Sequence, residues 1–397
     1  MIGSVPDGWR VEKLGDISTI QAGGTPSRSK PGYWNGDIPW IKISDVKNKY
    51  TKNATEFITE EGLNNSSAKL FQVDTILYTI FATLGEVSIL KFEATTNQAI
   101  SGIVVKDKNV NLYYLYNYLK SIKQKVINQG RGVAQNNINL GMLKNIDIPL
   151  PPLPQQEKIV KVLDISSSLI EKQKELIEKY DLFLKSKFIE MFGDPISNPM
   201  GWEVEKLKNS IVDVKNGLTR RGTKNSGDIV LKLKDIRANY VNFINLNRIE
   251  LDEKEKEKFI AEKNDLLFIR VNGNPEYVGR CAAFHGYAEP VYFNDHIMRI
   301  KLNTQRYNSV FLGYIVNSQY GKKQIVKYRK TSAGQHTISQ DGLERLSFYL
   351  PPIDLQNKFA SIVEKTEQIK KQESKKLEHL QTLHNSLMGK AFKGEIA

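Results

Sequence analysis

The stretch Gly8-Trp9-Arg10-Val11-Glu12-Lys13-Leu14 occurs a second time, almost unchanged, as Gly201-Trp202-Glu203-Val204-Glu205-Lys206-Leu207. Only the third residue differs between the two stretches. A second matching pair lies near the end of each copy, where Leu150-Pro151-Pro152 recurs as Leu350-Pro351-Pro352. Self-similarity over so long a period indicates that the chain is a tandem repeat of one structural unit.

The interiors of the two copies match only loosely. Lys42-x-x-Asp45 corresponds to Lys232-x-x-Asp235, and Asn137-Ile138 corresponds to Thr337-Ile338. The edges of the copies therefore agree while their interiors have diverged. We expect two copies of one scaffold that perform different versions of the same task.

Each copy begins with a block that mixes strand-like and helical patterns. Short apolar runs such as Thr75–Ile80 and Asp265–Ile269 alternate with turns rich in Gly, Asn and Pro, which is typical of β-strands. A longer apolar stretch with helical character follows at Tyr113–Ile127 and Val310–Val326. We predict an α+β fold with two similar mixed α/β domains, residues 1–153 and 193–353.

Each domain is followed by a long charged segment, residues 154–192 and 354–397. The first has no Pro or Gly between Gln155 and Phe192, and Pro154 suits the first turn of a helix. Apolar residues recur at heptad spacing, which favours a coiled coil. We expect the two helices, each roughly 57 Å long at ~1.5 Å per residue, to pair in antiparallel orientation as a spacer between the domains. The predicted seam consists of Val162, Leu163, Leu169, Ile170, Leu176, Ile177, Phe183, Leu184, Ile362, Ile369, Leu380 and Leu387.

The amino-acid composition limits the kinds of partner that the chain can have. The chain has 57 Lys and Arg against 44 Asp and Glu, a net charge of +13, which suits a polyanion. No apolar run approaches the ~20 residues that cross a bilayer, so no membrane partner is expected. A lone cysteine, Cys281, excludes an internal disulfide and a Cys-cluster zinc site. We therefore expect a cytoplasmic protein.

A search for catalytic motifs finds none. The chain has no phosphate-binding Gly-x-x-x-x-Gly-Lys-Ser/Thr loop. Asp37-Ile38-Pro39-Trp40 is the nearest string to the motif of an amino-group methyltransferase, but it lacks the first proline. All five histidines lie in the second copy, so a role for them would be absent from the first. We predict no catalytic residue, no metal site and no cofactor bound by this chain.

A protein that reads DNA needs Lys and Arg for the phosphates, and Arg, Lys, Asn or Gln for the base edges. The basic excess is marked in residues 101–150 and 301–350 at equivalent places of the repeat. The pattern is stronger for the domains than for any single residue. The candidates are Arg28, Lys30, Lys42, Arg131, Gln135 and Asn136 in the first domain, and Arg220, Arg221, Lys224, Lys232, Arg237, Arg270, Asn272, Arg329 and Lys330 in the second.

The whole chain resembles a type I restriction-modification specificity subunit. The resemblance rests on the two Gly-Trp-x-x-x-x-Leu openings, on Gly23-Gly24-Thr25-Pro26 leading to Ile38-Pro39-Trp40, and on the Leu-Pro-Pro strings. It rests also on Gln156 and Gln356 at the start of each long segment, and on Met191-Phe192-Gly193-Asp194-Pro195. The second copy lacks the Gly-Gly-Thr-Pro and Ile-Pro-Trp strings.

The resemblance implies a non-catalytic subunit with two target recognition domains, each of which reads one half of an asymmetric bipartite target in double-stranded DNA. It further implies that the paired helices set the gap between the half-sites and dock two methyltransferase subunits. Those subunits would methylate adenine N6 with S-adenosylmethionine, and restriction subunits, where present, would cleave DNA with ATP and Mg²⁺.

Two other classes of function stay open. A coiled-coil scaffold with protein-binding globular ends would share the repeat and the helices, and salt-sensitive, sequence-selective DNA binding would exclude it. A fused methyltransferase or nuclease lacks its motifs here, and activity of the purified chain with S-adenosylmethionine alone would support it.

Overall fold

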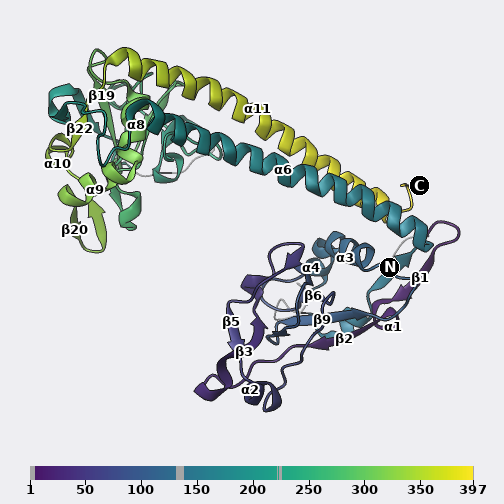
Figure 1. Ribbon diagram of the computed structural model, residues 1–397. Coiled ribbons are helices and arrows are strands. Elements are labelled where there is room, and N and C mark those ends of the chain that lie inside the picture. Colours follow the sequence, from purple (N-terminus) through teal and green to yellow (C-terminus); the bar gives the residue numbers. More distant parts are fainter. Residues whose placement is uncertain (1–4, 131–137, 221, 223–225, 397) are drawn as a thin grey trace. The chain divides into compact units, whose positions relative to one another are not determined.

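The computed structural model describes residues 5–130, 138–220, 222 and 226–396. The chain forms two compact units: unit 1 is Met1–Lys174 with Lys375–Ala397, and unit 2 is Glu175–Ser374. Each contains one globular part and one part of each long helix, α6 (Leu153–Phe192) and α11 (Ile353–Ala391) (Figure 1). The units are therefore not consecutive segments of chain, and the division into four consecutive segments stays a prediction.

The globular part of unit 1 is built on small sheets. The largest has the strand order β2 (Ser18–Ala22), β9 (Ile100–Val105), β6 (Ile76–Thr79), β7 (Val87–Leu90) and β4 (Tyr50–Thr51). A second has the order β5 (Glu56–Ile58), β3 (Trp34–Ile41) and β8 (Thr95–Thr96). A third pairs β1 (Arg10–Lys13) with β10 (Asp147–Leu150), so the two edges of the first copy meet in one antiparallel ladder.

Unit 2 repeats this plan. Its opening strand β11 (Val204–Lys206) pairs with β22 (Ser347–Tyr349). One sheet has the order β12 (Ile211–Asn216), β19 (Ile297–Leu302), β15 (Leu266–Ile269) and β17 (Cys281–Ala283), and another has β14 (Arg248–Ile249), β13 (Asp228–Leu231) and β18 (Val291–Phe293). A further three-stranded sheet has the order β16 (Val271–Asn272), β21 (Gln335–Thr337) and β20 (Lys330–Ser332).

Short helices complete both units. Unit 1 contains α1 (Leu14–Ile17), η1 (Pro31–Tyr33), η2 (Ile43–Asp45), α2 (Glu60–Asn64), α3 (Leu112–Ser121), α4 (Lys123–Gly130) and α5 (Leu140–Lys144). Unit 2 contains η3 (Leu207–Ser210), η4 (Leu233–Asp235), α7 (Glu253–Phe259), η5 (Pro275–Tyr277), α8 (Ser309–Asn317), α9 (Gln319–Tyr328) and α10 (Gln340–Glu344). Among the described residues, no helix is both long enough and apolar enough to cross a bilayer.

The apolar runs singled out in the sequence form the central strands. All four residues of β15 are buried: Leu266 and Phe268 belong to one core cluster, and Leu267 and Ile269 belong to another. Because successive side chains of a strand point to opposite faces, β15 has a core on both sides. Strand β6 of unit 1 has the same arrangement, which explains why neither run shows polar alternation.

Gln156 and Gln356 occupy equivalent places, and neither side chain is exposed. The Oε1 of Gln156 accepts a hydrogen bond from the Asn111 backbone N–H at 2.8 Å, and its Nε2 donates to the carbonyls of Asn109 and Pro151 at 2.8 and 2.9 Å. Each glutamine therefore joins the start of a long helix to the globular part of its unit.

The hydrogen bonds of Gln356 are the same in kind. Its Oε1 accepts from the Asn308 backbone N–H at 2.9 Å, and its Nε2 donates to the carbonyls of Arg306 and Pro351 at 2.9 and 2.8 Å. Asn308 also caps α8, as Asn111 caps α3. The repeat is thus preserved in the interactions that hold the scaffold together.

The second copy keeps one glycine of the Gly-Gly-Thr-Pro string that it otherwise lacks. A Cβ on Gly23 would lie 2.0–2.5 Å from atoms of Thr96 and Asn97. A Cβ on Gly217 would lie 2.3–2.5 Å from the backbone of Phe293 and Asn294. Both positions therefore require glycine because another segment crosses there in close contact.

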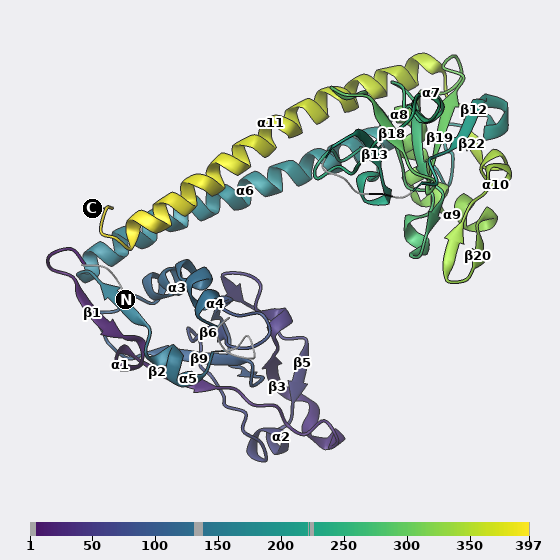
Figure 2. The same ribbon diagram turned by 180° about the vertical axis from the view of Figure 1, so that it is seen from behind.

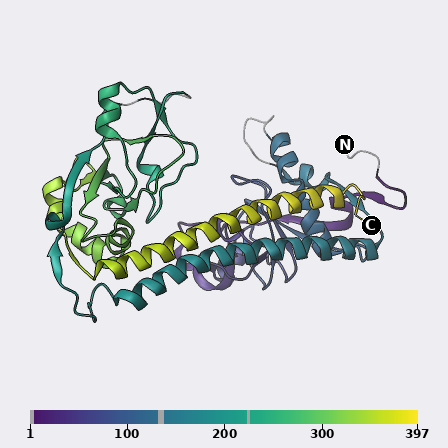
Figure 3. The same ribbon diagram turned by 90° about the horizontal axis from the view of Figure 1, so that it is seen from above.

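The long helices pair in antiparallel orientation within each unit (Figure 3). In unit 1 the start of α6 contacts the end of α11, where the Ser166 hydroxyl lies 2.8 Å from His384 Nδ1. In unit 2 the end of α6 contacts the start of α11, where Lys370 Nζ lies 2.6 Å from Asp181 Oδ1. The least exposed residues of each helix recur at spacings of three and four and form the seam between the helices. In α6 they stand at positions 163, 166, 170, 173, 177, 180 and 184, and in α11 at positions 363, 366, 370, 373, 377, 380 and 384.

The structure divides the predicted seam residues of α6 into two rows. Leu163 and Leu184 are 0% and 1% exposed, and Ile170 and Ile177 lie half-buried on the same row. Val162 is half-buried beside that row, while Leu169, Leu176 and Phe183 face outward with exposed fractions of 47%, 37% and 48%. Neighbouring residues differ by about 100° around a helix, so only one of each apolar pair can lie in the seam.

In α11, Leu380 lies on the seam row, and Ile369 faces outward with 40% of its surface exposed. Ile362 and Leu387 are partly buried against the cores of units 2 and 1, respectively. The weaker heptad pattern of this helix reflects its polar seam positions, which include Thr366, Lys370 and His384.

We expect the stability of unit 1 to depend on pH through His384. Burial in the seam, followed by the charge of nearby Lys120, lowers the pKa of this imidazole from its ordinary value of 6.5. The unfolded chain therefore binds a proton at a pH where the folded chain does not, and stability falls as pH drops through 6.5. Replacing His384 by Leu, the residue found at the equivalent position 184, should flatten this dependence between pH 7.5 and 5.5, measured by chemical denaturation.

The matched control is His379→Leu on the exposed side of the same helix, which should keep the wild-type pH dependence. An unchanged slope in the His384→Leu variant would show that other groups govern acid sensitivity in this range.

Candidate nucleic-acid interface

Two candidates of unit 1, Arg28 before β3 and Lys42 directly after it, come together at Glu56. Arg28 Nη2 lies 2.6 Å from Glu56 Oε2, and Lys42 Nζ lies 2.7 Å from Glu56 Oε1. The Arg28 guanidinium carbon lies 3.5 Å from the centre of the Trp34 ring. The hydrogen bond from Lys42, aided by that from Arg28, lowers the pKa of the Glu56 carboxyl. One carboxylate thus pairs with two of the predicted cations.

Lys30 extends this basic surface. Its Nζ donates to the Tyr33 hydroxyl at 2.9 Å, and this hydrogen bond raises the pKa of Lys30. Lys30 is exposed, as is most of the Arg28 side chain, so both can reach a phosphate. A guanidinium stacked on an indole presents its edge for bidentate hydrogen bonds, which suits phosphate or guanine.

Five candidates, Arg131, Gln135, Asn136, Arg221 and Lys224, lie outside the described residues. Of three others of unit 2, Lys232 and Arg237 both lie close to the Asp235 carboxyl, and Arg220 makes separate contacts. Arg220 makes an ion pair with Glu255 at 2.5 Å and donates to the Glu250 carbonyl at 2.6 Å. The backbone N–H of Lys232 donates to Asp235, and Arg237 is exposed in the turn closed by Tyr240.

The remaining four candidates of unit 2 surround the β16-β21-β20 sheet. Asn272 lies in β16, Lys330 begins β20, and Arg270 and Arg329 flank them. Arg329 Nη1 donates to the Pro275 carbonyl at 3.0 Å, and Arg270 Nη1 donates to the Asp295 carbonyl at 3.2 Å. Residues far apart in the sequence are therefore brought to one place.

Three polar residues of this sheet were not among the predicted candidates: Thr331, Gln335 and His336. Thr331 and Gln335 are exposed, and the Thr331 hydroxyl lies 2.8 Å from His336 Nδ1. The offset between the two copies of the repeat would have identified two of them. Gln335 and His336 stand at the same offset of 200 from the chosen Gln135 and Asn136 that relates the Leu-Pro-Pro strings.

Helix α9 adds positive charge beside the sheet. Lys322, Lys323 and Lys327 are exposed, and Lys322 pairs with Glu276 at 3.2 Å. The sequence contains no Asp or Glu from residue 303 to residue 340. This part of unit 2 is therefore suited to a polyanion.

Metal-binding and nucleophilic side chains are the groups that could support catalysis. Among the described residues, no group of three or more His, Cys, Asp or Glu side chains could hold a metal ion. The Cys281 thiol is fully buried in β17, and burial raises its pKa. It therefore stays protonated at neutral pH.

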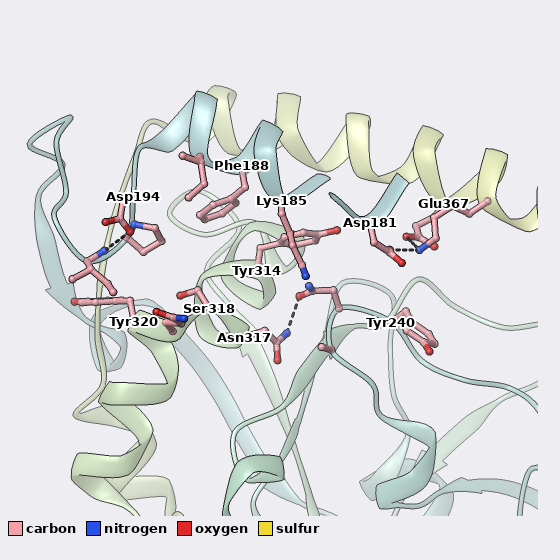
Figure 4. A pocket seen from close by; sticks show the side chains of 17 residues that line it. Asp181, Lys185, Phe188, Asp194, Tyr240, Tyr314, Asn317, Ser318, Tyr320 and Glu367 are labelled. Atoms are coloured by element: carbon pink, nitrogen blue, oxygen red, sulfur yellow. Dashed lines mark hydrogen bonds and ion pairs between the residues drawn. The ribbon is translucent and has the colours of Figure 1, made fainter. Parts of the chain in front are cut away.

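A cavity of about 680 Å³ lies in unit 2 between α6, α8 and the loop containing Tyr240 (Figure 4). Phe188 and Tyr314 stack inside it with ring centres 6.1 Å apart. Its rim carries Ile189, Ile196 and Tyr240, which are 46%, 48% and 50% exposed. The lining also includes charged side chains, among them Lys185 and Glu367, so the cavity suits a side chain of another protein that has both apolar and polar groups.

Comparison with known proteins places these observations in a family. The profile of the type I restriction modification DNA specificity domain matches residues 6–179 and again residues 199–379. The chain is similar to the StySPI type I restriction enzyme specificity subunit of Salmonella potsdam, with 29% identity over 99% of this chain and 90% of the relative. It is also 36% identical to the MjaIX specificity subunit of Methanocaldococcus jannaschii over 54% of each chain.

Solved structures share the fold. The S subunit of a type I restriction-modification system from M. genitalium matches with a TM-score of 0.55 and 17% identity, over 99% of this chain and 97% of that one. A chain from a study of complex assembly and conformational transition of the type I system matches with a TM-score of 0.61 and 16% identity, over 98% and 99%.

The two matched domains and the shared fold confirm the predicted fold class and the resemblance to specificity subunits. The chain belongs to the family of type I restriction-modification DNA specificity proteins and contains that family's domain twice.

Proposed function

We propose that this chain gives a type I restriction-modification complex its DNA sequence specificity, with each globular part reading one half of an asymmetric bipartite target in double-stranded DNA. One observation carries the proposal: the two copies share their scaffold hydrogen bonds, at Gln156 and Gln356, but differ in sequence between their matching edges. Equal scaffolds with unequal surfaces would bind two different half-sites, and the paired helices would set the gap between them.

The outward row of α6 supports docking of the methyltransferase subunits on the helices. Leu169, Leu176 and Phe183 recur every seven residues on the exposed side, accompanied by Lys172 and Lys179. Such a row can bind an amphipathic helix of a partner protein, whose apolar face would contact the row and whose acidic residues would contact the lysines. The rim of the unit 2 cavity offers a second apolar contact.

The chemistry would then belong to the partners. This chain would bind no cofactor, two methyltransferase subunits would transfer the methyl group of S-adenosylmethionine to adenine N6, and restriction subunits, where present, would use ATP and Mg²⁺. The complex would act on chromosomal DNA in the cytoplasm.

We expect a split, asymmetric adenine-methylation motif in cells that produce this chain together with its methyltransferase subunit. Neither protein alone should produce the motif, because one supplies recognition and the other supplies the reaction. A genome-wide map of methylated adenine in the three strains measures this. Failure of the two proteins to purify together would favour the coiled-coil scaffold, and a stable complex without new methylation would indicate an inactive or differently partnered subunit.

A further inference from the structure

The hairpin formed by β20 and β21 stands free of the rest of unit 2 at its tip. Ser332 pairs with Gln335 across a two-residue turn, in which Ala333 and Gly334 have φ of 47° and 74°. Two left-handed residues in succession fit a type I′ turn, whose twist matches that of the strands. A Cβ added to Gly334 would meet no atom within 4 Å. Within unit 2, the hairpin lies on the side remote from α11 (Figures 1 and 2).

Each face of this hairpin carries groups that can donate or accept hydrogen bonds. Thr331 and His336 are paired and share one face, while Ser332 and Gln335 are paired and share the other. Thr331, Ser332 and Gln335 are exposed, and the hairpin contains no acidic residue. Gln bonds adenine through two atoms, and Ser and Thr bond any base, so these side chains suit base edges.

The base of the hairpin is fixed to the core. His336 pairs with Asn272 of β16, and the fully buried Ile338 donates its backbone N–H to the Arg270 carbonyl at 2.9 Å. On the other strand, Arg329 is held by the Pro275 carbonyl. A free polar tip on a fixed base is preorganised for binding, which reduces the entropy lost on association.

The surroundings supply the second element of DNA recognition. The lysines of α9, among them Lys323 and Lys327, precede the hairpin directly and are exposed. Phosphate contacts orient a protein on the duplex, and base contacts confer the specificity. The major groove, about 12 Å wide, admits a two-stranded β-ribbon, whose strands lie about 4.8 Å apart.

We propose that the β20–β21 hairpin enters the major groove of the half-site read by unit 2, where Gln335 and His336 determine the base preference and the α9 lysines hold the flanking phosphates. The inference rests on the proposed function, because it assigns the reading residues of one of its two domains.

The test uses the full chain in complex with its methyltransferase subunit and compares Gln335→Ala and His336→Ala with the wild type. Methylation rates are measured on duplexes that carry the wild-type target or single base changes in either half-site. Each variant should lose discrimination by about 10- to 100-fold at one or two base pairs of one half-site and retain it at the other. Gln305→Ala, an exposed glutamine of unit 2 away from the hairpin, is the matched control and should behave as wild type.

A second variant separates reading from phosphate binding. Lys327→Ala should weaken binding to all sequences alike and make the logarithmic salt dependence shallower by about one. The proposal is overturned if both hairpin variants keep full discrimination at both half-sites, or if they weaken all sequences uniformly as Lys327→Ala does. A wild-type complex without a split motif would instead refute the proposed function itself.

Discussion

Replacing Gln356 by leucine should lower the free energy of unfolding of unit 2 by about 3–9 kcal/mol. The substitution leaves the Asn308 N–H and the carbonyls of Arg306 and Pro351 without a partner in a place that water does not reach. Each buried polar group left unpaired costs about 1–3 kcal/mol, whereas the volume of the side chain hardly changes. Hydrogen exchange of backbone amides, resolved by peptide, measures the loss separately for each unit.

Two controls accompany this variant. Gln368→Leu lies on the exposed side of the same helix and should leave stability almost unchanged. Gln156→Leu should produce an equal loss in unit 1, because its three hydrogen bonds are the same. A loss below about 1 kcal/mol for Gln356→Leu would mean that the network contributes little to stability.

Leu184→Ala should destabilise unit 2 by about 2–5 kcal/mol, and its neighbour Phe183→Ala should cost less than about 1 kcal/mol. Leu184 is 1% exposed and belongs to the core cluster that includes Phe188 and Phe359, so truncation leaves a cavity. Phe183 is 48% exposed on the outward row. Urea denaturation followed by hydrogen exchange compares the two variants.

The same pair of variants separates stability from assembly. Phe183→Ala should retain the fold and lose affinity for the methyltransferase subunit, because it removes a large apolar contact from the outward row. A larger loss of stability for Phe183→Ala than for Leu184→Ala would place Phe183 in the seam. Unchanged affinity of Phe183→Ala for the methyltransferase subunit would count against docking on the outward row.

The repeat and the long helices could be predicted because they depend on local patterns. Matching edges such as Leu150-Pro151-Pro152 are visible in the sequence alone, as is the absence of Pro and Gly from Gln155 to Phe192. The sequence does not predict which apolar residue of each pair enters the seam. Phe183 and Leu184, for example, both fit the seven-residue spacing, and the position of the partner helix decides between them.

The candidate interface was less accessible to prediction for a different reason. Arg220 and Arg270 look alike in the sequence, but Arg220 is engaged by Glu255 and Glu250, and Arg270 lies beside the hairpin. Arg270 is itself held by the Asp295 carbonyl, so contacts with residues distant in sequence decide where each cation lies. Gln335 and His336 could have been found by applying to Gln135 and Asn136 the offset of 200 that relates the two Leu-Pro-Pro strings.

The polar residues of the helix seam bear on the fidelity of pairing. Lys370 meets Asp181 and Glu367 at 2.6 and 2.9 Å, and His384 meets Ser166 at 2.8 Å. Suppose that α6 of another copy of the chain took the place of α11. Ile170 would then stand where Lys370 stands, and Leu184 would stand where His384 stands. Asp181 and Ser166 would therefore lose their hydrogen-bonding partners. Polar seam residues select partner and register at some cost in stability. The seam therefore discriminates between the two helices and disfavours the pairing of two identical helices from different molecules.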